Sequence, residues 1–141
     1  MHISKVFKFE AIFGTDLTND PDLEKAKDQL FLDFKAYLQS GQHLSSNPTG
    51  IFGRDATYDR PNSAKAANLR HVHVLPLSTL TACHQASKFH QTSDVHLVYC
   101  IDDTKGHACA IALLKPAHEL ANNHLFLSKL AEIAEQFFSR N

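Results

Sequence analysis

Histidine is the residue that first suggests chemistry in this chain, since ten of its 141 residues are histidines. Each imidazole can change its charge near neutral pH and can ligate a metal or move a proton. His71 and His73 are separated by one residue in an alternating segment, so both side chains point to one face of the predicted strand. His118 closely follows Lys115 and a proline after a very apolar segment, where a loop can present it on a rigid edge.

A metal site is an alternative use of the same histidines. His71 and His73 have the spacing of metal ligands on a strand, and seven other residues could add ligands: His84, His90, His96, His107, Cys83, Cys100 and Cys109. No second ligand pair with helical or Cys-x-x-Cys spacing accompanies them. The sequence therefore predicts neither a metal site nor a cofactor.

The composition bounds the class of protein. Hydrophobic residues make up 43% of the chain and charged residues 21%, which is typical of one globular domain with its own core. Because the chain lacks a run of about 18 apolar residues, we expect no transmembrane helix, no signal peptide and a cytoplasmic location. The net charge of -1 predicts low non-specific affinity for nucleic acid. An odd number of cysteines argues against a disulfide framework.

Hydrophobic periodicity predicts the elements that must position these residues. Alternating or continuous apolar segments predict strands over 7–13, 69–77, 95–101 and 108–116, the last two forming a hairpin. Apolar stripes predict helices over 21–40 and 127–138. We therefore expect an α+β fold in a single domain over 1–141, with a small antiparallel-type sheet and helices packed on one face. The expected order is β, α, an irregular segment, β, β, β, α.

Four segments, in this order, resemble the YafO family of bacterial toxins: IFGRDATYD, HVH, FHQTSDVHLVYC and AIALLKPAHELA. The likeness covers 51–141 and continues into the helical tail, whereas the first fifty residues agree only in pattern. The resemblance implies a toxin of a type II toxin-antitoxin system with the RelE-like fold. It also implies a ribosome-dependent endoribonuclease, an mRNA interferase that inhibits translation. The implied partners are a cognate antitoxin, the large ribosomal subunit and translated mRNA, with no membrane and no DNA contact by the toxin alone.

The implied reaction defines roles for the candidate residues. Cleavage of RNA without a metal uses the neighbouring 2'-hydroxyl as nucleophile, so it needs a base, an acid at the leaving 5'-oxygen and cations over the phosphate. We expect His118 and one of His71 or His73 to exchange the protons. By resemblance, Lys115 is a phosphate-binding cation and His118 the acid. The structural alternatives are that His71 and His73 are hydrogen-bonded core residues and that Lys115 only extends its amine into water.

The segment from Gly50 to Pro61 adds candidates for RNA binding. Arg54 could hold a phosphate bidentately, Tyr58 could stack on an unpaired base, and Asp55 or Asp59 could orient the arginine or a histidine. In the structural alternative, Asp55 pairs with Arg54 or caps a short helix over 54–58.

Two further residues are second candidates for the site. His96 and Tyr99 lie in the predicted strand over 95–101, where a histidine is more often a hydrogen-bonded core residue and a tyrosine more often packs.

A binding-only inhibitor is the competing class of function. The nearly neutral charge departs from the strongly basic balance usual for a toxin that cuts RNA. Such a protein would occupy the ribosome or its antitoxin without doing chemistry, and a histidine-ligated metal protein is a third class.

Overall fold

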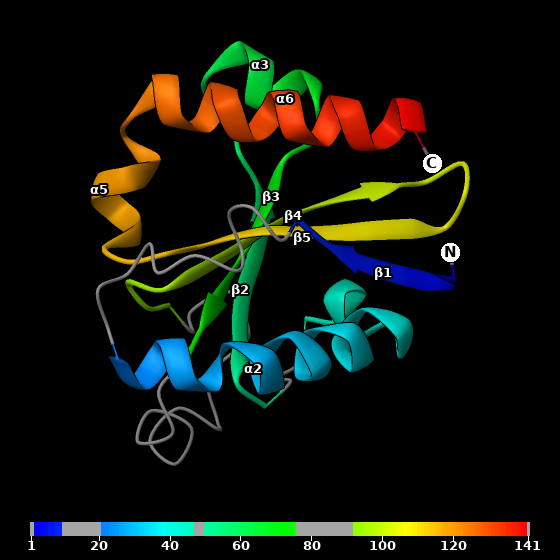
Figure 1. Ribbon diagram of the computed structural model, residues 1–141, viewed down its shortest axis with the longest axis vertical. Coiled ribbons are helices and arrows are strands. Elements are labelled where there is room, and N and C mark those ends of the chain that lie inside the picture. The colour runs from blue at the N-terminus through cyan, green and yellow to red at the C-terminus, as the bar shows by residue number, and fades with distance from the viewer. Residues whose placement is uncertain (1, 10–20, 47–49, 76–91, 141) are drawn as a thin grey trace.

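The computed structural model describes residues 2–9, 21–46, 50–75 and 92–140. These residues form a five-stranded sheet with strand order β1-β5-β4-β3-β2 (Figure 1). The strands are β1 (Lys5–Lys8), β2 (Phe52–Thr57), β3 (Arg70–Val74), β4 (His96–Asp102) and β5 (His107–Leu114). The helices are α2 (Pro21–Gln39), the 3-10 helix η1 (Gln42–Leu44), α3 (Asn62–Ala66), α5 (Ala117–Ala121) and α6 (His124–Arg140).

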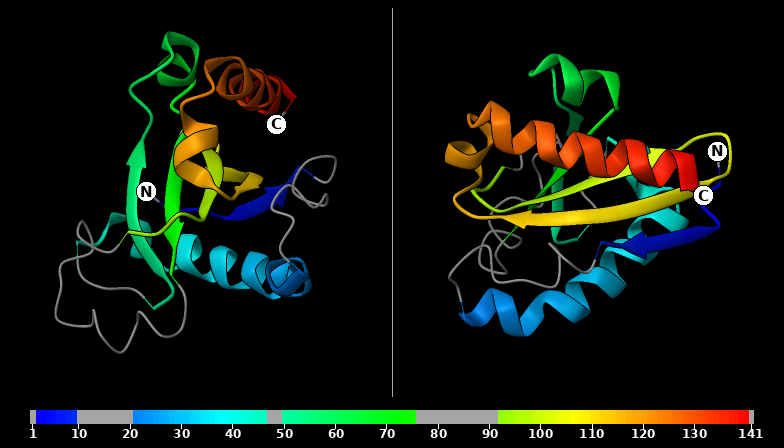
Figure 2. Two further views of the ribbon diagram at one scale, coloured as in Figure 1. Left: turned by 90° about the vertical axis from the view of Figure 1, so that its left-hand side faces the viewer. Right: turned by 45° about the horizontal axis from the view of Figure 1, so that its top comes forward.

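The predicted α+β class is confirmed, and the arrangement is consistent with a small RelE-like toxin fold. Strands β2 to β5 are antiparallel neighbours, but β1 pairs with β5 in parallel, so the sheet is mixed rather than purely antiparallel. The helices also lie on both faces of the sheet rather than on one (Figures 1 and 2). In both figures, α2 lies beneath the sheet and α6 and α3 lie above it.

Each face of the sheet has its own hydrophobic cluster. On one face, Phe34 of α2 packs with Val72 and Leu97. On the other face, Leu130 of α6 packs with Ile111 and similar residues. The central strands β4 and β5 are therefore buried on both sides, which explains why their sequences are nearly continuous apolar runs.

The two long helices match their predicted ranges closely. Pro21 begins α2, as its fixed φ and missing N–H favour, and Gly41 follows the helix at a φ of 79°. The strand β1 begins two residues before the strand expected over 7–13 and overlaps it at residues 7 and 8, whereas residues 10–13 lie outside the described ranges. In the described part of the chain, no helix has both the length and the apolar character to span a membrane.

Four short elements of the described residues were not predicted: η1, β2, α3 and α5. The strand β2 and the helix α3 fall in the segment expected to be irregular, and α5 falls between the last predicted strand and the last predicted helix. The two short helices have five residues each, too few to show a full apolar stripe.

Candidate functional site

Four histidines gather on the sheet face that α6 covers, and we call them the histidine cluster: His71, His73, His96 and His118. His73 and His96 are directly opposite each other on β3 and β4, with ring centroids 4.1 Å apart. The ring of His71 stacks on that of His96 at 4.8 Å, and the ring of His118 meets the same imidazole edge-on at 5.8 Å. The fold thus brings together residues from three separate segments.

Asp94 holds the turn that carries His118 to the cluster. The backbone N–H of His118 donates to Oδ1 of Asp94 at 2.9 Å, and the backbone N–H of Ala117 donates to its carbonyl oxygen at 2.9 Å. Because Asp94 precedes β4 and Ala117 begins α5, these two bonds tie the ends of β4 and β5 together. His118 remains exposed, and the half-buried Lys115 lies one residue beyond Leu114, the partner of His96 on β5.

The backbone of Ser93 orients His73. Nδ1 of His73 lies 2.8 Å from the nitrogen of Ser93 and 2.9 Å from its carbonyl oxygen. It accepts from the N–H in one neutral tautomer and donates to the oxygen in the other. In either case the backbone engages Nδ1, which leaves Nε2 as the ring nitrogen that can transfer a proton.

Burial keeps the three strand histidines neutral at physiological pH. Burial, and after it the neighbouring His73, lower the pKa of His71 to about 4 and that of His96 to about 3. The pKa of His73 is also lowered, mainly by burial, although its bond to Ser93 opposes the shift. A charged imidazole would be poorly solvated there. Neutral imidazoles can accept a proton, so these residues suit the role of a base.

The cluster also contains buried nitrogens that lack a partner among the described residues. Both ring nitrogens of His96 and Nδ1 of His71 are buried without a hydrogen-bond partner in the part of the chain that the structure describes. Such atoms destabilise a fold, and a native protein that retains them often uses them in function.

Strand β2 sends two neighbouring side chains to opposite faces of the sheet. Phe52 is opposite Val74 and Asp55 is opposite Val72, so β2 contains one residue more than β3 over this stretch. This is a β-bulge, and it includes Arg54. Because Asp55 faces α2 and successive side chains of a strand alternate between the faces, its neighbour Arg54 lies on the face of the histidine cluster.

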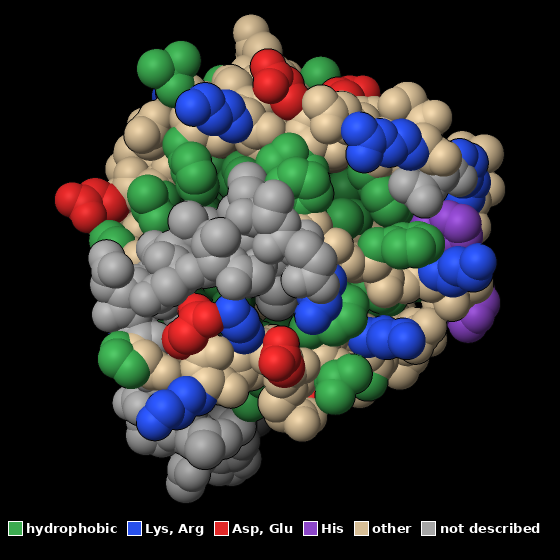
Figure 3. All heavy atoms as spheres, viewed as in Figure 1, with side chains coloured by type: hydrophobic (Ala, Val, Ile, Leu, Met, Phe, Trp, Pro, Cys, Tyr) green, Lys and Arg blue, Asp and Glu red, His purple; other side chains and the backbone are tan. Residues whose placement is uncertain are grey.

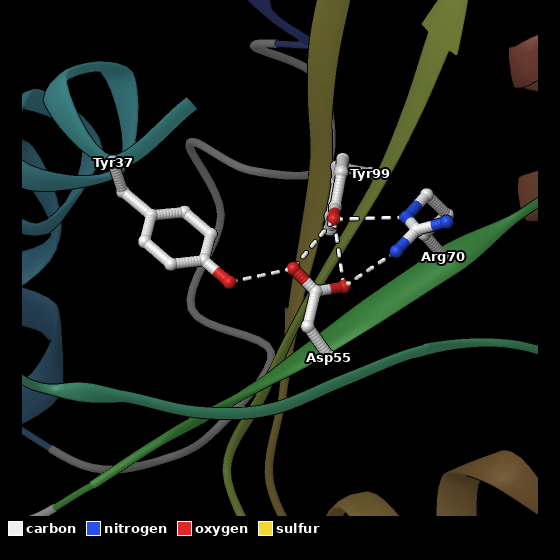
Figure 4. A network of polar contacts seen from close by, with 4 residues as sticks. All are labelled: Tyr37, Asp55, Arg70 and Tyr99. Atoms are coloured by element: carbon white, nitrogen blue, oxygen red, sulfur yellow. Dashed lines mark hydrogen bonds and ion pairs between the residues drawn. The ribbon is translucent and has the colours of Figure 1, made fainter. Parts of the chain in front are cut away.

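On the opposite face, Asp55 is the centre of a buried polar network (Figure 4). Its side chain is only 2% exposed and accepts hydrogen bonds from the hydroxyls of Tyr37 and Tyr99 at 2.7 Å and from Arg70 at 3.2 Å. The hydroxyl of Tyr99 also accepts a bond from Nε of Arg70 at 2.9 Å. Burial, and after it the carboxylate, raises the pKa of both tyrosines, so both remain protonated donors. We call these four residues the Asp55 network.

The network corrects the predicted surroundings of Asp55. Its ion-pair partner is Arg70 rather than Arg54, and residues 54–57 form part of β2 rather than a short helix. Tyr37 and Arg70 were not predicted as site residues. The one available signal was a charged residue, Arg70, on the same strand face as the apolar Val72.

Tyr58 lies beneath the histidine cluster. Its ring stacks on His71 with centroids 4.3 Å apart, and only 7% of the residue is exposed. Tyr58 therefore packs against the imidazole of His71, and too little of its ring is exposed for the predicted stacking on an unpaired base.

The described residues contain no group of three or more histidine, cysteine, aspartate or glutamate side chains arranged to hold a metal ion. The imidazoles of the cluster instead pack as stacked and edge-on rings. Cys100 and Cys109 are buried free thiols, and the remaining ligand candidates Cys83, His84 and His90 lie outside the described residues.

The predicted site residues therefore divide between the two faces of the sheet. His71, His73, His96 and His118 lie together, with Arg54 on their side and Tyr58 beneath them. Asp55 and Tyr99 lie on the other face, in the Asp55 network. Lys115 is at the end of β5 that leads to His118.

A family model described as "Toxin YafO, type II toxin-antitoxin system" matches residues 35–139. This range includes every residue of the histidine cluster and of the Asp55 network. No curated protein and no solved structure is significantly similar to the chain.

Proposed function

Because the chain belongs to the YafO family, whose members are toxins of type II toxin-antitoxin systems, we propose that it is an endoribonuclease that cleaves translated mRNA on the ribosome. A toxin of this class has a cognate antitoxin as a partner. Cleavage of the message would inhibit translation, and the antitoxin would silence the activity.

The proposed reaction needs neither a metal nor a cofactor. The 2'-hydroxyl attacks the adjacent phosphorus and gives its proton to a base, while the bond to the 5'-oxygen breaks and that oxygen takes a proton from an acid. The products are a 2',3'-cyclic phosphate and a free 5'-hydroxyl. Cations near the phosphate stabilise the charge that develops on its oxygens.

The observation that carries the proposal is the histidine cluster with Arg54 on the same side of the sheet. The base is His73 or His71: both are neutral, the backbone orients the buried His73, and His71 is the more exposed of the two. The exposed His118 is the acid, and Arg54 and Lys115 bind the phosphate. Each proton-transfer residue is expected to contribute roughly 10²- to 10⁴-fold to the rate.

Primer extension on mRNA from cells that briefly express the protein tests this proposal. We expect new 5'-ends within coding regions, which disappear when an inhibitor blocks translation. His118→Ala should abolish them and Arg54→Ala should weaken them strongly, whereas His124→Ala and Lys129→Ala, which remove an exposed histidine and an exposed lysine of α6, should leave them unchanged. Cleavage that survives His118→Ala unchanged would overturn the role of this residue.

A binding-only inhibitor is the second candidate, favoured by the net charge of -1. On the face drawn in Figure 3, basic and acidic side chains are interspersed among hydrophobic ones. Free RNA would bind weakly to such a surface, although docking on the ribosome could supply the substrate at high effective concentration. Growth arrest without new 5'-ends would favour this candidate.

A further inference from the structure

We propose that the Asp55 network is a positioning device for Arg54: Tyr37, Tyr99 and Arg70 lock Asp55, and Asp55 fixes the bulge that aims the guanidinium at the histidine cluster. The inference rests on the proposed function, because it concerns the phosphate-binding role of Arg54. It assigns a role in the reaction to residues that lie on the far face of the sheet from the chemistry.

The first step of the argument is the geometry of β2. Phe52 and Asp55 both face α2, although their positions in the chain differ by three, and residues on one face of a regular strand differ by an even number. In a regular strand, Asp55 would face away from α2 if Phe52 faced it. The extra residue of the bulge lets both side chains face α2, and it turns Arg54 toward the histidines. Bulges beside active sites commonly re-aim a side chain in this way.

The second step is that the bulge needs an anchor. The ladder between β2 and β3 is interrupted from Phe52 to Asp55, so hydrogen bonds to β3 hold this stretch less firmly. Asp55, the first residue after the irregularity, is instead held through its side chain by three donors on three different elements. Tyr37 is on α2, Arg70 is on β3 and Tyr99 is on β4. Anchoring to three elements fixes the position of the carboxylate in space.

The third step is that packing of the core alone does not require the polar groups of the Asp55 network. A charged carboxylate with a 2% exposed side chain needs several strong hydrogen bonds to be tolerated, and apolar residues at these positions could fill the same space. Hydrogen bonds to an ionised carboxylate are short and directional, as the two 2.7 Å bonds from the tyrosine hydroxyls are, and this suits a group that sets the position of its neighbour. The network therefore specifies one backbone path next to Arg54.

Tyr37→Phe is the sharpest test. It removes one hydroxyl from the network and keeps the ring that packs against Phe34 and Phe52. We expect a rate of mRNA cleavage between about 10-fold and 100-fold lower in a reconstituted translation system, because small misplacements of a positioning group have effects of this size. Tyr99→Phe, which removes a different donor to Asp55, should act in the same direction.

A double-mutant cycle distinguishes positioning from a general loss of stability. If the network acts through Arg54, Tyr37→Phe will lower cleavage in the wild-type chain but have little further effect in an Arg54→Ala chain. Equal losses in both backgrounds would overturn the proposal. Ile111→Val, which trims a fully buried residue of the core on the other face, is the control for stability and should leave cleavage unchanged.

The cycle also separates the failure of this inference from the failure of the proposed function. If the wild-type chain produces no cleavage, the proposed endoribonuclease is wrong. If Arg54→Ala lowers cleavage strongly but Tyr37→Phe and Tyr99→Phe leave it at the wild-type rate, only the positioning role is wrong. The turnover rate at saturating ribosomes, rather than the affinity for ribosomes, is the parameter that we expect to fall.

Discussion

At the residue scale, His96 combines deep burial with two ring nitrogens that have no hydrogen-bond partner among the described residues. A leucine of similar size would need no partner. We therefore predict that His96→Leu raises the free energy of unfolding by about 1–3 kcal/mol, the usual penalty for a buried unsatisfied polar group. Urea denaturation at pH 7.5 measures the change.

The same variant should lose activity if His96 serves the site rather than the core. Its ring contacts His71, His73 and His118, so its loss should disturb their packing and lower mRNA cleavage. A variant that is more stable and less active would be the trade-off expected of a functional residue. A less stable variant with full activity would contradict the prediction.

A second residue-scale prediction concerns pH. In the unfolded chain, histidines gain protons as the pH falls through about 6.5. In the folded chain, His71 and His96 do so only at about 4 and about 3. Between these pH values the unfolded chain binds more protons than the folded chain. The free energy of unfolding should therefore decrease as the pH is lowered, by up to about 1.4 kcal/mol per pH unit for each residue.

Urea denaturation between pH 7.5 and pH 4.5 measures this dependence. Above about pH 6.5 the two residues are neutral in both states and should add no slope. His96→Leu is the matched comparison, because other groups titrate equally in both chains. Below pH 6.5 its slope should be smaller than that of the wild-type chain, and identical slopes would show that His96 is not buried as a neutral ring.

The sequence predicted part of this site. The two-residue period placed His71 and His73 on one strand face, and the apolar segment before Lys115 placed His118 at a strand end. It could not place His96 against His73, because the register between β3 and β4 depends on the packing of both strands. For the same reason Tyr37 and Arg70, which are 33 residues apart in the sequence by their numbering, gave no sign of a common partner.

At the element scale, the turn between β4 and β5 also holds the entry to β1. The backbone N–H of Ser4 donates to the carbonyl oxygen of Gly106 at 2.8 Å. Gly106 has a φ of +68°, and a Cβ there would lie 2.6 Å from the carbonyl oxygen of His2. An alanine would therefore both strain the turn and push the start of β1 away.

We predict that Gly106→Ala lowers the free energy of unfolding by about 2–4 kcal/mol, combining backbone strain with the displacement of β1. Gly41→Ala is the matched control, since Gly41 has a φ of +79° and an added Cβ would meet nothing within 4 Å. It should cost only about 1–2 kcal/mol, from the left-handed backbone alone. Equal losses in urea denaturation would mean that the contact with His2 does not constrain β1.

Local patterns sufficed for some elements and failed for others. Pro21, Gly41 and long apolar stripes fixed the two long helices within a few residues. The parallel pairing of β1 with β5 was beyond prediction, because these strands are about a hundred residues apart and the alternation in β1 does not specify a partner. The strand β2 was also missed, since its bulge breaks the two-residue period between Phe52 and Asp55.

At the scale of the whole molecule, both faces of the sheet are apolar and must be buried by a helix, and the two helices that do so come from opposite ends of the chain. α6 covers one face, and α2 covers the other together with Ile3. The family match begins at residue 35, within α2. The apolar residues that precede it still belong to the core, because Leu30 and Phe34 are buried in the α2 cluster.

We therefore predict that a chain of residues 35–141, which starts where the family match starts, does not fold. It would lose β1 and most of α2, and with them Ile3, Leu30 and Phe34. Each buried side chain of this size contributes about 2–5 kcal/mol, so the combined loss is comparable to the total stability of about 5–15 kcal/mol of a small domain. Circular dichroism and urea denaturation of both chains, with the full chain as the control, measure the difference. A cooperative unfolding transition in the shorter chain would mean that the α6 cluster alone sustains the fold, and that the N-terminal residues serve another purpose. The expected result, no transition, would instead mean that Tyr37 and the network above it depend on residues that the family match does not include.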